Sequence, residues 1–161
     1  MGRGIFAAAP PPPPRARAQI AEFQPHDATT NPSLVNAAAR LPEHAHRIDD
    51  AVAYAARSSV VGNEEERMAL LIDKVFVNFG VELTKRVPGF VSIEVDARLS
   101  YHTAASLARA RRIIALCAER GVPRERILVK LAATWEGIQV RRAARRRCAC
   151  GAGGRVQRVC A

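Results

Sequence analysis

The sequence predicts an α/β fold with a parallel sheet, because two strand patterns are separated by one long amphipathic helix pattern. Residues 91–95 alternate apolar and polar side chains, as a strand with two different faces does. Residues 103–120 repeat apolar side chains at helical spacing and end before Gly121 and Pro123. Residues 127–134 form the second strand pattern. A strand, a helix and a strand in this order build a right-handed parallel crossover, which is typical of α/β folds.

The chain before residue 91 is predicted to form further helices. Pro32 blocks a helix at Asn31 and allows one to begin near Pro32 and Ser33. One helical pattern follows over about residues 43–57, and a stronger one begins at Glu64. The apolar positions of the stronger pattern are Met68, Leu71, Ile72, Val75 and Phe79. Apolar faces of this kind must be covered, so we expect these helices to pack against the rest of the fold.

The distribution of charge divides the chain into three parts. The 161 residues carry a formal charge of +10, and 48% of them are hydrophobic and 25% charged, as in an ordinary globular protein. Residues 21–139 hold 15 basic and 15 acidic side chains. The excess lies in residues 1–20, with three arginines and no acid, and in residues 140–161, with seven arginines and no acid. We expect one folded domain over 21–139, between a disordered Pro/Ala/Arg-rich leader and a disordered Arg/Gly/Cys-rich tail.

Composition also argues against several kinds of site. No stretch approaches the roughly 20 apolar residues of a membrane-spanning helix. Cys148, Cys150 and Cys160 crowd into the last 14 residues, which argues against a disulfide framework and lacks the ligand spacing of a zinc site. We therefore expect no metal and no membrane partner. Arginines without acids in the leader allow a plastid transit peptide, but the prolines at 10–14 favour an extended arm, so we expect a cytoplasmic protein.

One lysine interrupts the apolar pattern of the second strand. Lys130 lies on the same face as Leu128 and Ala132, opposite Ile127 and Val129. A buried amine has a lowered pKa and attacks a carbonyl carbon to form an imine. A lysine at a sheet edge can instead extend to water, and this simpler interpretation stays open.

A glutamate raises the same question in the first strand. Glu94 lies between Ile93 and Val95, which point to the opposite face. In a barrel alternate residues point inward, so Glu94 and Lys130 would meet in the interior. A carboxylate beside an iminium lysine can shuttle protons through a water, although a glutamate on a half-exposed strand is commonly only solvated.

Three longer motifs carry a family resemblance. Residues 27–34 (DATTNPSL), 91–100 (VSIEVDARLS) and 127–139 (ILVKLAATWEGIQ) resemble three motifs of the transaldolases, in the order in which that family has them. The resemblance covers about residues 20–139. It implies a partial (β/α)8 TIM barrel, comprising about strands two to four, that does not close.

The resemblance also implies a chemistry. Transaldolases are cofactor-free enzymes of the pentose phosphate pathway, often homodimeric, that transfer a dihydroxyacetone unit from sedoheptulose 7-phosphate to glyceraldehyde 3-phosphate. Fructose 6-phosphate and erythrose 4-phosphate are the other sugar phosphates expected as partners. By resemblance Lys130 is the Schiff-base nucleophile, and Glu94 is an acid/base that acts through a water. Asn31 would hydrogen-bond the bound dihydroxyacetone unit, and Thr29 would help to hold the catalytic water.

The sequence departs from the family pattern on both sides of these motifs. The family carries a catalytic aspartate in a strand before the first motif, whereas residues 1–20 contain no acidic residue. After Gln139 the sequence no longer resembles the approach to a fifth strand. A (β/α)8 barrel takes about 250 residues, and three strands cannot close into one. We therefore expect open sheet edges, no residue assigned to the substrate phosphate, and no turnover by this chain alone.

Two other functions stay open. The first is a non-enzymatic basic fragment that binds nucleic acid or acidic partners through its arginine-rich tail. Because the excess charge lies outside the predicted domain and lacks interleaved aromatic residues, such binding would be weak, salt-sensitive and without specificity. The second is another Schiff-base aldolase with the same barrel, although residues 27–34 and 134–137 favour a transaldolase.

Overall fold

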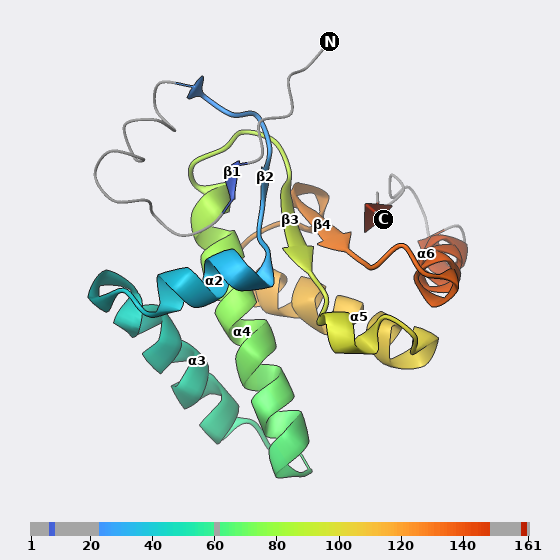
Figure 1. Ribbon diagram of the computed structural model, residues 1–161, viewed down its shortest axis with the longest axis horizontal. Helices are drawn as coiled ribbons and strands as arrows, with labels where there is room; N and C mark the ends of the chain where they lie inside the picture. The colour runs from blue at the N-terminus through green and yellow to red at the C-terminus, as the bar shows by residue number, and fades with distance from the viewer. Residues whose placement is uncertain (1–6, 9–22, 60–61, 149–158, 161) are drawn as a thin grey trace.

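The computed structural model describes residues 7–8, 23–59, 62–148 and 159–160 (Figure 1). Its helices are α2 (Pro32–Ala39), α3 (Ala45–Arg57), α4 (Glu64–Thr84), α5 (Thr103–Glu119) and α6 (Trp135–Cys148), with 3-10 turns at Pro42–His44, Ala97–Leu99 and Arg124–Arg126. Its strands are β1 (Ala7–Ala8), β2 (Ala28–Thr29), β3 (Val91–Glu94), β4 (Ile127–Lys130) and β5 (Val159–Cys160). This mixture of helices and parallel strands confirms the predicted α/β fold class.

The strands form one parallel sheet in the order β1-β2-β3-β4-β5. Its longest pairing joins β3 to β4, from Val91 with Ile127 to Glu94 with Lys130. In the described part of the chain the sheet is open, as expected of a partial barrel, with β1 and β5 at its edges. β3 and β4 are the strands that the sequence pattern predicts, although β4 ends at Lys130 and not at residue 134. β2 corresponds to strand two of the partial barrel that the resemblance implies. β1 and β5 were not expected, because strands of two residues leave no periodic pattern in a sequence.

The edge strands and α6 change the expected limits of the fold. β1 lies within the leader 1–20 and β5 within the tail 140–161, and most of the other residues of both segments lie outside the described ones. α6 continues past Gln139 to Cys148, so the expected disorder is wrong for residues 140–148. Alanine and arginine favour helix, and Val140, only 1% exposed, attaches this helix to the core.

The main core lies between the sheet and two helices. Val91 and Ile93 of β3 and Ile127 and Val129 of β4 are buried, whereas the residues between them are half-buried. α4 and α5 pack on this apolar face (Figure 1). The alternate residues of both strands therefore point away from α4 and α5, as the inward-facing residues of a barrel do.

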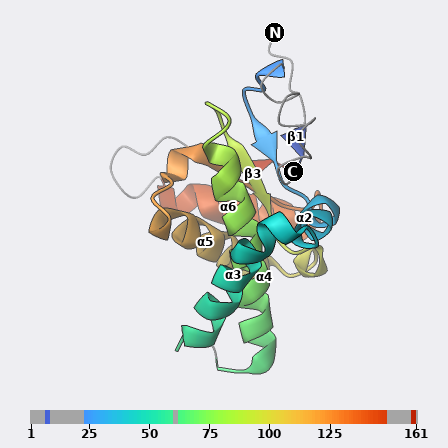
Figure 2. The same ribbon diagram turned by 90° about the vertical axis from the view of Figure 1, so that its left-hand side faces the viewer.

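Helix α4 is buried on two sides. Leu70 and Val77 belong to the core beneath the sheet, while Val75 and Phe79 belong to a second apolar cluster with residues of α2 and α3. Figure 2 shows α3 lying along α4, so α3 forms a further layer outside the sheet. The sequence pattern identified the stripe that faces α3, but its predicted member Met68 is 53% exposed. One amphipathic pattern cannot represent a helix that is covered on two sides.

Candidate active site

A lysine and a glutamate meet on the polar face of the sheet. β3 and β4 pair in register at Glu94 and Lys130, so both residues lie on the same side of the sheet. Lys130 Nζ lies 2.7 Å from Glu94 Oε2. Just beyond this pair, Val95 N donates a hydrogen bond of 3.0 Å to Lys130 O, which holds the strand ends together. The proximity that strand alternation predicts is therefore present.

The pair is only partly shielded from water. The side chain of Lys130 is 33% exposed and that of Glu94 is 21% exposed. α4 and α5 cover only the opposite face of the sheet, so the amine of Lys130 is not fully buried. Lys130 is also not a lysine that merely extends to solvent, since its ammonium group contacts a carboxylate. Imine formation requires a neutral amine, and Glu94 lies within hydrogen-bond distance to accept the proton.

Thr29 lies two strands away from Lys130, near the end of β2. It pairs with Ser92 of β3, and therefore lies on the same side of the sheet as Glu94. Its hydroxyl donates a hydrogen bond of 3.2 Å to Thr30 O. Among the described residues, this hydroxyl does not hydrogen-bond the Lys130–Glu94 pair directly, so its expected role in holding a water stays a prediction.

Asn31 follows β2 and caps helix α2. Its side-chain Oδ1 accepts a hydrogen bond of 2.9 Å from Leu34 N, and Pro32 occupies the first turn of the helix. This is the helix start that the sequence predicts. Because the cap uses the amide oxygen, the Nδ2 group is the one suited to donate to a ligand. The structure thus fixes the position of Asn31 without testing its expected contact with dihydroxyacetone.

A threonine after β4 joins the two loops beside the lysine–glutamate pair. Thr134 Oγ1 donates a hydrogen bond of 2.6 Å to Ser100 O, in the loop after β3. The same oxygen accepts from Gly137 N at 3.1 Å, which caps the start of α6. Sequence reasoning did not single out Thr134 by itself, although a threonine just before a helix is a common N-cap.

Asp96 lies just beyond β3, and an arginine neutralises its charge. Arg98 Nη2 lies 2.6 Å from Asp96 Oδ2, and Arg98 Nε and N also donate to the carboxylate. These hydrogen bonds lower the pKa of Asp96, although partial burial opposes the shift. Asp96 is therefore ionised at neutral pH and, unlike Glu94, is held by a neighbour on its own loop.

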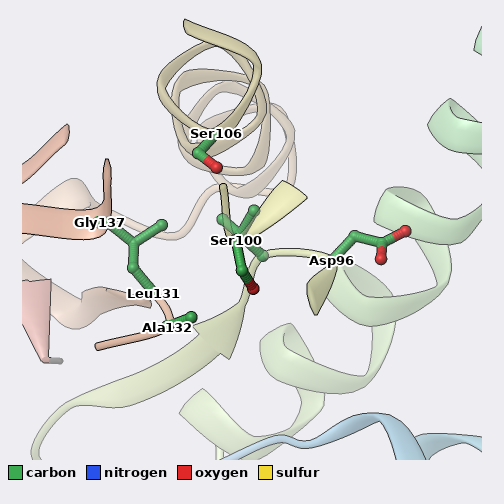
Figure 3. A pocket seen from close by; sticks show the side chains of 7 residues that line it. Asp96, Ser100, Ser106, Leu131, Ala132 and Gly137 are labelled. Atoms are coloured by element: carbon green, nitrogen blue, oxygen red, sulfur yellow. The ribbon is translucent and has the colours of Figure 1, made fainter. Parts of the chain in front are cut away.

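A small cavity lies just beyond the ends of β3 and β4. Its volume of about 10 Å³ approaches the smallest that holds one water. Figure 3 shows its lining: Val95, Asp96, Ser100, Ser106, Leu131, Ala132 and Gly137. Val95 and Leu131, the residues directly after β3 and β4, are buried, and neither Glu94 nor Lys130 lines the cavity.

Other chemistries find little support in the described residues. Burial raises the pKa of Cys117 to about 12, so its thiol is not a nucleophile at neutral pH. Among the residues that the structure describes, no group of three or more His, Cys, Asp or Glu side chains is arranged to hold a metal ion. None of the described helices combines the length and the apolar character needed to cross a membrane.

Comparison with known proteins supports and extends the sequence resemblance. The family model described as transaldolase/fructose-6-phosphate aldolase matches residues 15–147, beyond the expected limits of 20 and 139. Transaldolases from Sus scrofa and Homo sapiens are 52% and 51% identical over 120 residues, which are 74% of this chain and 35% of either relative. The transaldolase of Edwardsiella ictaluri is 50% identical over 122 residues, 76% of this chain and 38% of the relative. The chain thus spans little more than a third of the length of these relatives.

Proposed function

Because the chain belongs to the transaldolase/fructose-6-phosphate aldolase family, we propose that the polar face of its sheet is part of a transaldolase active site. In this proposal Lys130 forms an imine with a ketose, and Glu94 carries protons to and from the reacting groups. The contact of 2.7 Å between Lys130 Nζ and Glu94 Oε2 carries the proposal. This pair supplies the nucleophile and the proton acceptor that imine formation requires.

The proposed reaction moves a dihydroxyacetone unit between sugar phosphates. Sedoheptulose 7-phosphate gives the unit to glyceraldehyde 3-phosphate, and the products are erythrose 4-phosphate and fructose 6-phosphate. The relatives from pig and human are named transaldolases, which favours transfer over simple aldol cleavage. The proposal needs no cofactor, because a protonated imine itself draws the electrons of the carbon–carbon bond that breaks.

Imine formation begins when the ammonium group of Lys130 gives a proton to Glu94. The neutral amine then adds to the carbonyl carbon of the ketose, and a carbon–nitrogen bond forms. The former carbonyl oxygen takes up protons and leaves as water, with Glu94 returning a proton through an intervening water. The partial exposure of Lys130, 33%, leaves its amine within reach of a substrate.

Two residues at the end of β2 are proposed to bind this substrate. Asn31 would donate from Nδ2 to a hydroxyl of the dihydroxyacetone unit, and Thr29 would hold the water that serves Glu94. The helix cap supports the first assignment, because it holds the Asn31 amide by its oxygen. The register of Thr29 with Ser92 supports the second, because it sets Thr29 on the side of the sheet that carries Glu94.

A trapping experiment tests the proposed nucleophile. Residues 24–139 would replace the matching segment of the Sus scrofa transaldolase, so that the remainder of that relative completes the barrel. We expect fructose 6-phosphate and borohydride to leave a stable secondary amine on Lys130, which peptide mapping would locate. The other two lysines of the segment, Lys74 and Lys85, lie on and next to α4 and serve as internal controls. Sugar trapped on either of them instead of on Lys130 would show that the nucleophile is wrongly assigned.

A further inference from the structure

Helix α6 presents an exposed face that the proposed active site does not use. Its opposite side is fixed to the core through Val140, which is 1% exposed. Trp135, Ile138 and Arg142 follow one another at spacings of three and four residues, so they share one side of the helix. All three are exposed, as is Arg141. Figure 1 shows α6 at the opposite side of the molecule from α3, and α6 packs against α5.

This helix concentrates positive charge. Arginines occupy five of its positions, and Glu136 is its one acidic residue. The arginines are Arg141, Arg142, Arg145, Arg146 and Arg147. The arginine-rich stretch after Gln139, which composition alone suggests is a separate disordered tail, therefore begins within the fold. Its first arginines extend from a helix that is packed against the core.

The described arginines of α6 differ in their partners from Arg109 and Arg112 of α5. Arg109 and Arg112 of α5 bind Asp73 at 3.0 and 2.7 Å, and this one carboxylate offsets part of their charge. Within the described residues, neither Arg141 nor Arg142 forms an ion pair with a carboxylate. The contact of Arg142 is with an aromatic ring, since its guanidinium carbon lies 5.8 Å from the centroid of Trp135. The positive potential of this face is therefore available to an external anion.

Trp135 adds an aromatic surface to this positive charge. It is 64% exposed, whereas tryptophan is highly buried on average in folded proteins. An exposed ring beside arginine guanidinium groups is the combination on which proteins stack the bases of single-stranded nucleic acid. No aromatic residue interrupts the arginines along the sequence, but the helix places the Trp135 ring within about two turns of Arg141 and Arg142.

We propose that the exposed face of α6 binds single-stranded nucleic acid without sequence preference. Arg141 and Arg142 contact backbone phosphates, and Trp135 stacks on a base. An anionic membrane fits this face less well, because an interfacial helix needs a broad apolar side. The exposed apolar residues of the described part of α6 are only Trp135 and Ile138, while Val140 is occupied in the core.

The fluorescence of Trp135 provides the test, because it is the one tryptophan in the chain. The full chain would be titrated with oligo(dT) of about 20 nucleotides, which exceeds the site size of small single-strand binding modules. We expect base stacking to quench the tryptophan emission. Heparin, a polyanion without bases, should bind by charge but leave the emission nearly unchanged. Trp135→Ala should weaken binding of fluorescein-labelled oligo(dT) roughly tenfold and leave heparin binding unaffected.

A charge-matched pair of variants tests the location of the site. Arg141→Gln/Arg142→Gln should reduce the slope of log affinity against log salt by about 1.4, because each phosphate that is no longer neutralised lowers the slope by roughly 0.7. Arg57→Gln/Arg67→Gln removes the same charge from exposed positions on α3 and α4 and should leave the slope unchanged. Equal effects of both double variants would overturn the proposal. So would unquenched emission with oligo(dT), or binding to phosphatidylserine vesicles without binding to oligo(dT).

Discussion

At the scale of single residues, two lysines with different surroundings show what a nucleophile needs. Lys74 is only 3% exposed, and burial lowers its pKa, with its ammonium group 4.2 Å from the centroid of the Tyr54 ring. A substrate cannot reach an amine buried to this extent. Lys130 is more exposed and contacts Glu94, so it combines access with a proton acceptor. Access and a partner, rather than burial alone, distinguish the candidate nucleophile.

The first prediction concerns this pair in the barrel completed by the Sus scrofa segments. Lys130→Met keeps a side chain of similar length but removes the amine, so borohydride trapping and turnover should both disappear. Glu94→Gln keeps the amine, so some imine should still be trapped while turnover falls by roughly 10² to 10⁴ fold, as expected when a general acid/base is removed. Peptide mapping and a coupled enzyme assay measure the two effects. Lys85→Met, an exposed control, should change neither.

The second prediction concerns Cys117, whose pKa burial raises from 9.0 to about 12. Because the pKa is higher in the folded state, folding favours the protonated thiol. The contribution of Cys117 to stability is therefore complete below pH 9.0 and is lost as the pH rises toward 12. We expect the unfolding free energy of the chain to fall more steeply over this window than that of Cys117→Ala. Urea titrations at several pH values measure it. Parallel curves for the two proteins would contradict the assignment.

At the scale of elements, close packing of α4 on β3 depends on a glycine. A Cβ atom at Gly80 would lie 2.5 Å from Cδ1 and 2.9 Å from Cγ1 of Ile93, which is fully buried. Real side chains do not approach so closely, so the Ile93 side chain or one of the two elements must shift when a methyl group is added. The sequence pattern does not reveal this contact, because an isolated glycine in a helix pattern has no partner until the helix is docked.

The third prediction follows from this contact. Gly80→Ala should destabilise the fold by about 1 kcal/mol, because overpacking costs roughly 1–3 kcal/mol and the better helix propensity of alanine returns about 1 kcal/mol. Ile93→Val removes the nearest clashing atom, so the double variant should be more stable than the sum of the two single effects. Gly62→Ala is the control, since its nearest atom is Glu66 Oε2 at 3.9 Å. Additive effects at positions 80 and 93 would refute the contact.

At the scale of the whole molecule, the open sheet determines what the isolated chain can do. Over the residues that the structure describes, the five parallel strands leave the polar face with Lys130 and Glu94 partly open to water. A closed barrel excludes water from such a face and surrounds a substrate with positioned groups. The chemistry proposed for the pair therefore depends on elements beyond this open sheet.

The fourth prediction is that the purified 161-residue chain has no transaldolase turnover. The same residues 24–139, set within the Sus scrofa barrel, should turn over sedoheptulose 7-phosphate and glyceraldehyde 3-phosphate in a coupled assay. The Lys130→Met variant of that graft defines the background of the assay. Turnover by the isolated chain above this background would show that the open sheet suffices for catalysis.

The sequence alone determined the class of fold and the members of the candidate site. Alternation over residues 91–95 and 127–134 set Glu94 and Lys130 on the polar faces of two parallel strands, and the two residues pair in register. Local patterns suffice here because strand period and crossover handedness are local rules. The start of α2 at Asn31 and Pro32 was predictable for the same reason, since caps depend on neighbouring residues.

Only the tertiary structure decided how these elements combine. The edge strands exist through pairing with a neighbour, because two residues carry no pattern of their own. α6 extends to Cys148 and docks through Val140, although its arginines by composition indicate a disordered tail. Thr134 joins the loops after β3 and β4 through a bond to Ser100, 34 residues away. Contacts between distant segments decide all three features, and short windows of sequence do not contain them.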